Sequence, residues 1–367
     1  VTPQAATGST PDERAVLHPL LHCNSSTLHE QRYSTRLSGN EWFVREHRVA
    51  GQPVVPGVVQ LEWARAAAAL ASELPVGQPM LLEEVAWLRP LVVSQPLLVH
   101  IGLVEEPGRG VRYEIHSGTG TQKLLYSQGW VRPASGQPAP QVDLAAVGAS
   151  CQSQVDVASC YARFTEQGLE YGAGFRALKE LRSGPLAALA SLAVASAAPG
   201  YTLPPSLLDG ALQAVTGWLA KPALQLPFAL TRVEQWGPLP DPAWAVVRRT
   251  SGEQGAGQSF DVDLVHADGQ VAVRLSGFCC RTPAQPELAG ELTLAPRWQT
   301  LEAVRTIADT QDQHQHLLEV PEAIARQWGT PDGAAACASW LGARTGFDHL
   351  LWHVPQGQPG VARIGLQ

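Results

Sequence analysis

A histidine stands shortly before a Pro-Gly pair that opens a long apolar helix. His47 precedes Pro56 by nine residues, Gly57 follows, and the segment 58–73 combines strong helix formers with apolar positions on every side. The first N–H groups of a helix have no partner within it and lie at its positive end, where a carbonyl oxygen would be polarised. A histidine on the preceding loop could then take a proton from the carbon beside that carbonyl. The pattern predicts proton abstraction next to a thioester or ketone.

A second group of suitable chemistry is needed, because a loop histidine is more often structural and Pro-Gly commonly precedes helices. Asp209 and Gln213 provide it. Ser206 and Asp209 have the spacing of a capping box, which predicts a helix from Ser206 to about Ala220. Asp209 and Gln213 share one face of this apolar helix, where burial should raise the pKa of the carboxyl and keep it protonated. The alternative is that Asp209 only caps the helix.

The two segments together resemble the dehydratase domain of modular polyketide synthases. They supply its His-x3-Gly-x4-Pro motif, with Gly51 between His47 and Pro56, and its downstream Asp-x3-Gln motif. Shorter stretches agree in the same order: His18-Pro-Leu-Leu, 85–93, 168–175, Leu226-Pro227-Phe228 and Gly277-Phe278. The resemblance covers roughly residues 15–285. Residues 24–33 look more like synthases loaded by a free-standing acyltransferase, the trans-acyltransferase type.

The resemblance implies an α+β double hotdog, in which two curved antiparallel sheets each surround one long helix. It divides the chain into an N-terminal hotdog at 1–135 with the catalytic His, a Pro-rich linker at 136–152, and a C-terminal hotdog at 153–286 with the catalytic Asp. Strand-like alternation at 111–116 and 260–265 supports this fold independently, and Asp268-Gly269 predicts a tight hairpin. The active site is expected between the two halves.

Residues 287–367 form an extension that resembles the start of the structural subdomain of a ketoreductase. We expect a strand at 292–298, a short helix at 320–328 and a second strand at 347–354. The extension has no Gly-rich dinucleotide fingerprint, so nucleotide binding is not expected there.

The resemblance also implies roles for individual residues. His47 takes the α proton of a β-hydroxyacyl thioester, and protonated Asp209 gives its proton to the leaving hydroxyl. The N–H of Gly57 holds the thioester oxygen, while Gln213 and Tyr171 hold the Asp209 carboxyl. The remaining motif and channel residues are Gly51, Pro56, Gly172, Phe175, Leu226, Pro227 and Phe228. The acyl chain is carried on the phosphopantetheine arm of an acyl carrier protein, and no bound cofactor or metal is expected.

Two departures from the family pattern leave other activities open. Ala173 stands where the family usually has Pro, and Pro204 stands where it usually has His. One alternative is a dehydratase-like cyclase that forms a pyran ring by oxa-Michael addition, alone or after dehydration. A second alternative is a non-catalytic hotdog scaffold. The presence of Asp209 favours dehydration over a pure cyclase, and it disfavours double-bond-shifting relatives, which often have Asn at this position.

Composition restricts the remaining classes of function. The chain has 367 residues, 45% hydrophobic and 16% charged, and its net charge of −7 argues against a broad nucleic-acid surface. It has no apolar run near the ~20 residues that span a bilayer and no signal-peptide pattern at its start, so we expect a cytoplasmic protein without a membrane partner. The expected partners are an acyl carrier protein, neighbouring domains such as a ketoreductase, and a second copy in a homodimer.

Cysteine and histidine spacing does not predict a metal site. The six cysteines include no Cys-x2-Cys pair, which favours free thiols over disulfides or zinc. His18, His22 and His29 lie close in sequence, but Leu17 and Pro19 indicate a loop entering a strand, not a helix face with two ligands.

Overall fold

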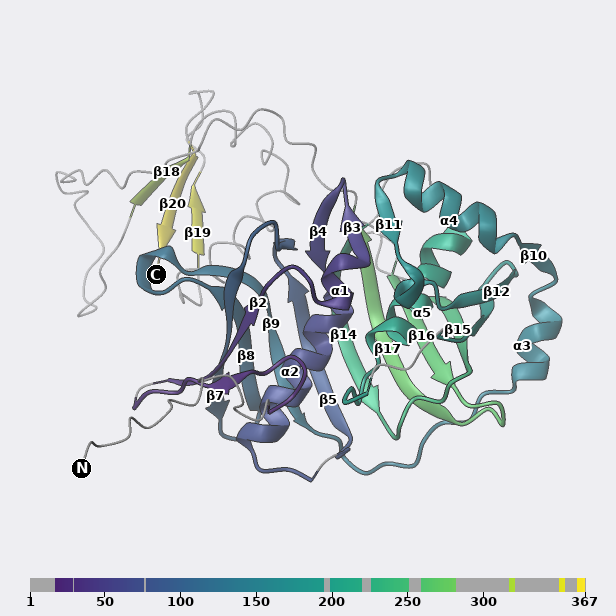
Figure 1. Ribbon diagram of the computed structural model, residues 1–367, viewed down its shortest axis with the longest axis horizontal. Coiled ribbons are helices and arrows are strands. Elements are labelled where there is room, and N and C mark those ends of the chain that lie inside the picture. Colours follow the sequence, from purple (N-terminus) through teal and green to yellow (C-terminus); the bar gives the residue numbers. More distant parts are fainter. Residues whose placement is uncertain are drawn as a thin grey trace, which may run out of the picture. The chain divides into compact units, whose positions relative to one another are not determined.

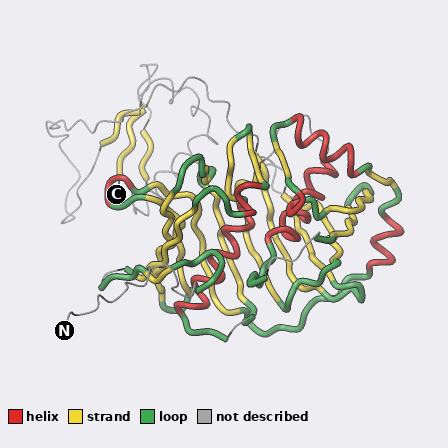
Figure 2. The backbone as a smooth tube through the Cα atoms, in the orientation of Figure 1, coloured by secondary structure: helices red, strands yellow, loops and turns green. Residues whose placement is uncertain are grey.

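The computed structural model describes residues 17–28, 30–75, 77–194, 199–219, 226–250, 259–281, 317–320, 350–353 and 362–366. The chain divides into two compact units, Val1–Ala284 and Gln285–Gln367. In the described part of the first unit, a 13-stranded antiparallel sheet curves around two long helices, α2 (Gly57–Ala71) and α5 (Pro205–Leu219) (Figure 1). Figure 2 shows the same two helices in red against the yellow strands.

The N-terminal half of the sheet surrounds α2. Its strands, in spatial order, are β1 (Cys23–Asn24), β2 (Gln31–Leu37), β7 (Leu97–Glu106), β8 (Gly110–Ser117), β9 (Leu124–Pro133) and β5 (Met80–Trp87). Alternate residues of β7, such as Val99 and Ile101, are buried in the core. The side chains of α2 from Val58 to Ala68 are all buried, and its many alanines let the strands approach the helix closely.

The C-terminal half repeats this arrangement around α5. Its strands, in spatial order, are β14 (Leu226–Gln235), β17 (Val271–Arg281), β16 (Ser259–Val265), β15 (Ala243–Thr250), β13 (Ala187–Leu192), β12 (Leu178–Ser183) and β10 (Ser153–Val155). The predicted hairpin at Asp268-Gly269 joins β16 to β17, and Gly269 has a φ of +91° that favours glycine. β5 pairs with β14, with Val85 opposite Leu230, so the two hotdogs share one continuous sheet. The double-hotdog fold is therefore confirmed.

A second, four-stranded sheet connects the halves and leads into the N-terminus of α2. It has the order β11 (Leu169–Tyr171), β3 (His47–Val49), β4 (Gln52–Val55) and β6 (Leu91–Val92). Strand β11 belongs to the second half and pairs with β3 of the first, which sets Tyr171 opposite His47. The tight turn between β3 and β4 gives Gly51 a φ of +75°, which explains a glycine there.

Shorter helices cover the edges of these sheets. They are α1 (Trp42–Arg45), α3 (Leu144–Ser150) and α4 (Val157–Glu166), with 3-10 turns at Gly120–Gln122 and Ala173–Phe175. Helix α3 lies inside the stretch predicted as a linker. It forms there because the Asp143 side chain caps the first turn by accepting a hydrogen bond from the N–H of Ala146 at 2.9 Å.

The second unit contains three described strands, which form a sheet of their own. The order is β18 (Leu317–Val320), β20 (Ala362–Leu366) and β19 (Leu350–His353), and both pairings are antiparallel. The predicted strand at 347–354 overlaps β19. Val320, predicted to start a helix, ends strand β18 instead, because it pairs with Ala362. The rest of that helix and the strand predicted at 292–298 lie outside the described residues.

A buried carboxylate on α2 holds three segments together. Glu62 is fully buried, and Arg65 donates two hydrogen bonds to it at 2.7 and 2.9 Å. His18 lies 3.1 Å away, and the backbone N–H groups of Thr202 and Leu203 donate at 2.9 Å each. Burial would raise the pKa of Glu62, but these hydrogen bonds and the Arg65 charge lower it. The carboxylate therefore links the N-terminal motif and α2 to the segment that leads into α5.

Replacing Glu62 with Ala should destabilise the protein strongly, because Arg65 would remain buried without its counter-ion. We expect a loss of about 3–5 kcal/mol in the free energy of unfolding, measured by urea denaturation. Glu106→Ala is the matched control, since Glu106 and Arg112 form a 3.9 Å pair with 46% and 39% of their side chains exposed. The control should cost less than about 1 kcal/mol. Equal losses in the two variants would contradict the structural role of Glu62.

Candidate active site

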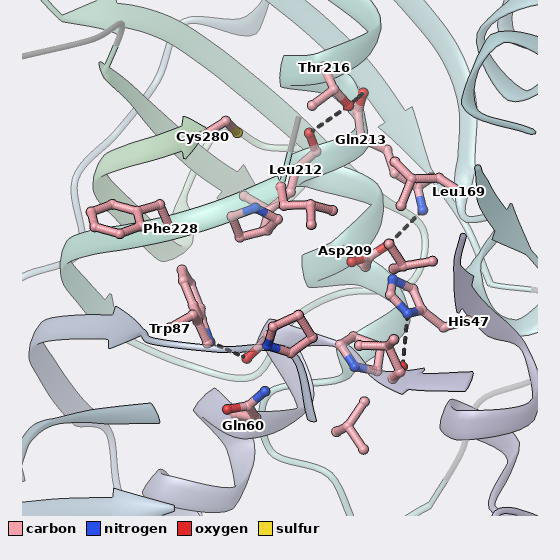
Figure 3. Close-up of a pocket in the computed structure, with 18 of the residues that line it drawn as sticks. His47, Gln60, Trp87, Leu169, Asp209, Leu212, Gln213, Thr216, Phe228 and Cys280 are labelled. Carbon is pink, nitrogen blue, oxygen red and sulfur yellow. Dashed lines mark hydrogen bonds between the residues drawn. The ribbon is translucent and has the colours of Figure 1, made fainter. Parts of the chain in front are cut away.

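A cavity of about 540 Å³ opens between the two halves of the first unit. Its walls come from α2 and the four-stranded sheet on one side and from α5, β14 and β17 on the other (Figure 3). Nine of the residues predicted from the sequence line it: His47, Pro56, Gly57, Tyr171, Asp209, Gln213, Leu226, Pro227 and Phe228. The other three, Gly51, Gly172 and Phe175, lie outside its lining.

His47 is held in one tautomer. Its side chain is buried, and its Nδ1 lies 2.9 Å from the carbonyl oxygen of Val54. A carbonyl can only accept, so Nδ1 donates and Nε2 carries the lone pair. Burial lowers the pKa of His47 to about 4, which keeps the ring neutral at ordinary pH. The prediction of a loop here was wrong: His47 begins strand β3, because the chain pairs there with both β4 and β11.

Burial also shifts the pKa of Asp209, but in the opposite direction from that of His47. Its carboxyl is buried on α5, and burial raises its pKa to about 7, although a 2.7 Å hydrogen bond from Gln213 Nε2 opposes this shift. Figure 3 shows this carboxyl beside the His47 ring. A carboxyl that keeps its proton up to about pH 7 and a neutral imidazole thus lie together in one cavity, one from each half.

The helix start predicted at Ser206 was wrong by one residue, and the capping role of Asp209 was wrong as well. Helix α5 begins at Pro205, and its first hydrogen bond runs from the N–H of Leu208 to the carbonyl of Pro204. Proline suits the first helical position because its missing N–H would have no partner there. Asp209 therefore lies within the helix, where its carboxyl bonds to Gln213 and faces the cavity.

Gln213 is fixed by three partners. Its Nε2 donates to Asp209 and, at 2.8 Å, to the carbonyl of Phe175, while its Oε1 accepts from the Tyr161 hydroxyl at 2.8 Å. Tyr161 lies on α4 and was missed by sequence reasoning. A tyrosine on an amphipathic helix gives no sign of a partner 52 residues away, so only the packing of α4 against α5 reveals it.

Two aromatic residues of the motif at 168–175 pack against the His47 ring. The rings of Tyr171 and Phe175 have their centres 5.5 and 5.7 Å from that of His47. Among the described residues, the hydrogen bond to Asp209 comes from Gln213, so Tyr171 contributes packing and a cavity wall, not the predicted hold on the carboxyl. A Cβ at Gly172 would lie 2.7 Å from the side chain of Glu46, which explains the glycine.

Gly57 is the first residue of α2, and its small size lets an aromatic ring close the cavity. A Cβ at this position would lie 2.8 Å from the ring of Trp87. The Trp87 indole N–H donates to the carbonyl of Gly57 at 3.2 Å. The backbone N–H of Gly57 belongs to the first turn, where no helical partner is available to it. It is therefore a suitable donor for a ligand in the cavity.

The remaining polar chemistry of the described residues is simple. Cys23, Cys151, Cys160 and Cys279 are free thiols, while Cys337 lies outside the described residues. Three or more His, Cys, Asp or Glu side chains do not gather into a metal-binding group anywhere in the described ranges. Within those ranges, every helix is too short or too polar to span a bilayer.

Comparisons with known proteins agree across both halves. A family model described as a polyketide synthase dehydratase domain matches residues 18–118, and one described as a polyketide synthase dehydratase N-terminal domain matches residues 139–290. Polyketide synthase PksN of Bacillus subtilis (strain 168) is 38% identical over 282 residues, covering 73% of this chain. PksM of the same organism is 28% identical over 397 residues, covering 96% of this chain. The chain spans only 5% of PksN and 9% of PksM.

A solved structure extends the match to three dimensions. The crystal structure of a trans-acyltransferase polyketide synthase dehydratase domain from Brevibacillus brevis is 36% identical, with a TM-score of 0.69. The match covers 73% of this chain and 99% of that one. With the family models, the curated relatives and the fold in agreement, the chain belongs to the dehydratase domains of polyketide synthases, of the trans-acyltransferase type.

Proposed function

We propose that this domain removes water from a β-hydroxyacyl thioester on an acyl carrier protein and leaves an α,β-unsaturated acyl chain. The observation that carries the proposal is the pairing of a neutral His47 with a protonated Asp209 in one cavity. An elimination needs both a base for the α proton and an acid for the leaving hydroxyl, and the opposite pKa shifts supply both near neutral pH.

In the proposed reaction, Nε2 of His47 removes the α proton. Since Nδ1 donates to Val54, the lone pair of Nε2 is available to the cavity, and the imidazolium formed keeps that hydrogen bond. The α C–H bond breaks and its electrons move toward the thioester carbonyl. The N–H of Gly57, at the positive end of α2, stabilises the charge that develops on that oxygen.

Asp209 then protonates the β-hydroxyl that leaves. Its proton moves to the β-oxygen as the C–O bond breaks, so that water leaves and the new double bond forms between the α and β carbons. Gln213 then stabilises the carboxylate through the amide that Tyr161 and Phe175 hold in place. A return of the proton from the imidazolium to the carboxylate restores the starting state.

The proposed chemistry uses two side chains and a backbone N–H. The thioester already acidifies its α proton, so the proposal includes no bound cofactor. The phosphopantetheine arm of the carrier protein delivers the acyl chain. The proposal also includes neighbouring synthase domains such as a ketoreductase, which would supply the β-hydroxyl, and pairing of two copies. The free thiols of Cys23, Cys151, Cys160 and Cys279 fit a cytoplasmic setting.

The two alternatives have less support. A scaffold would not need an open cavity of about 540 Å³ with both titratable groups facing it. A pure cyclase would not need the acid, and Asp209 is present with its orienting amide. Cyclisation after dehydration requires a second hydroxyl on the chain and uses the same His47.

Removing either titratable group should abolish most of the turnover. We expect His47→Ala and Asp209→Asn each to lower kcat by about 10²–10⁴-fold, since each deletes one partner of the proton transfers. The measurement is mass spectrometry of a carrier protein loaded with a 3-hydroxyacyl chain, which follows the loss of one water. Thermal melting of both variants serves as the folding control. A folded variant that keeps most of its activity would refute the assignment.

The pH dependence should follow the two shifted pKa values. The active form has neutral His47 and protonated Asp209, so kcat/KM should be highest between about pH 4 and about pH 7. Above pH 7 it should fall about tenfold per pH unit as Asp209 loses its proton, and below pH 4 it should fall as His47 becomes charged. The profile of kcat/KM for the same substrate tests this. A rate that rises from pH 7 to pH 9 would contradict the acid role of Asp209.

Tyr161→Phe tests the support behind the acid. The change leaves Gln213 Oε1 without its donor and frees the amide to turn away from Asp209. We expect kcat to fall about 3–10-fold, the contribution of one neutral hydrogen bond, with little change in KM. Tyr113→Phe is the matched control, because Tyr113 is also buried but its hydroxyl bonds Ser127, on strand β9. The same loss of kcat in both variants would show a general effect of the missing hydroxyl.

A further inference from the structure

One amide oxygen in the cavity wall is buried without a hydrogen-bond partner. Gln60 lines the cavity from α2, one helical turn beyond Gly57, and only 3% of its surface is exposed. Its Oε1 is buried and has no hydrogen-bond partner among the described residues. By contrast, the Thr216 hydroxyl donates to the carbonyl of Gln213 at 3.1 Å, and Trp87 donates to Gly57. Among the described residues that line the cavity, Gln60 is the one whose side chain has a buried polar atom without a hydrogen-bond partner.

An unpaired buried amide is costly, and the mechanism proposed above does not use it. Polar groups buried without a partner are rare in folded proteins and often belong to functional sites. Rotation of the terminal amide by half a turn exchanges the positions of Oε1 and Nε2. Gln60 can therefore offer either an acceptor or a donor to the cavity. A hydroxyl group is both donor and acceptor and matches either orientation.

The position of Gln60 separates it from the acid and base, His47 and Asp209. Figure 3 shows it next to Trp87, across the cavity from His47 and Asp209. The β-hydroxyl that leaves must lie at Asp209, so a group at Gln60 belongs to another part of the substrate. The phosphopantetheine arm comes from solvent, and the cavity lining is exposed to solvent at Leu88, Arg89 and Pro90, whereas Gln60 is buried on α2. The acyl chain is the part of the substrate that reaches deepest.

Resting on the function proposed above, we infer that Gln60 binds a second hydroxyl on the acyl chain, remote from the one that leaves as water. The domain would then select chains that carry oxygen beyond the β carbon over plain alkyl chains. A site built to hydrogen-bond a hydroxyl disfavours the analogue that lacks it, because the buried amide then stays unpaired.

The test compares two chains of equal length on the same carrier protein. One is a 3-hydroxyacyl chain, and the other carries a second hydroxyl at carbon 5 or at carbon 7. The wild-type domain should favour the dihydroxy chain by about 3–10-fold in kcat/KM, measured as total loss of water by mass spectrometry. Gln60→Met, which has similar length but no amide, should lose this preference through slower reaction of the dihydroxy chain alone. Thr216→Val is the matched control, and its effect should be equal on both chains.

Three outcomes would overturn the inference. An equal fall on both chains in Gln60→Met would assign the amide to the phosphopantetheine arm, which the substrates share. The absence of a preference in the wild type would mean that water alone satisfies the amide. The third outcome concerns binding, measured as the increase in Tm when each loaded carrier protein is added to Asp209→Asn. The dihydroxy chain should raise the Tm more than the 3-hydroxyacyl chain, and Gln60→Met should remove this difference. Equal increases for the two chains in Asp209→Asn would overturn the inference. This last comparison does not depend on turnover, so it decides the inference even if neither chain loses water and the proposed dehydration fails.

Discussion

The pairing of β5 with β14 makes one sheet out of two hotdogs, and the active site depends on it. Each sheet alone would bury its own helix, but the shared sheet brings the first turn of α2 and the middle of α5 to a common cavity. Strand β11 then crosses from the second half to pair with β3 of the first, so His47 is fixed by residues of both halves. Backbone hydrogen bonds between the halves thus hold the side chains that face each other across the cavity.

Burial acts on the two titratable groups in opposite directions and produces one result. Desolvation disfavours the charged form of any group, so it lowers the pKa of His47 and raises that of Asp209. Between about pH 4 and about pH 7 both groups are therefore mainly neutral, so the base can accept a proton and the acid can give one. Burial in the cavity is the largest cause of both shifts.

Two buried carboxylates in this protein show how the number of donors decides the charge. Glu62 receives hydrogen bonds from Arg65 and from two backbone N–H groups, and its pKa is lowered despite burial. Asp209 receives one neutral amide from Gln213, too little to offset desolvation, and its pKa is raised. The first therefore serves as a structural anion between segments, and the second has the properties of a general acid.

The sequence by itself determined the two long helices, one hairpin and the residue types that could act as base and acid. Local patterns were enough to locate the two long helices to within two residues and the hairpin at Asp268-Gly269, because these depend on periodicity and turn residues. The meeting of His47 with Asp209 in one site came from the resemblance to the dehydratase family, not from these patterns. Where the chain pairs across long distances, the patterns failed: His47 lies on a strand, and Val320 ends one. Only the tertiary structure revealed the hydrogen bond of Tyr161 to Gln213 and the unpaired amide of Gln60. Both result from side chains that meet through packing, and a linear sequence carries no local signal of such a contact.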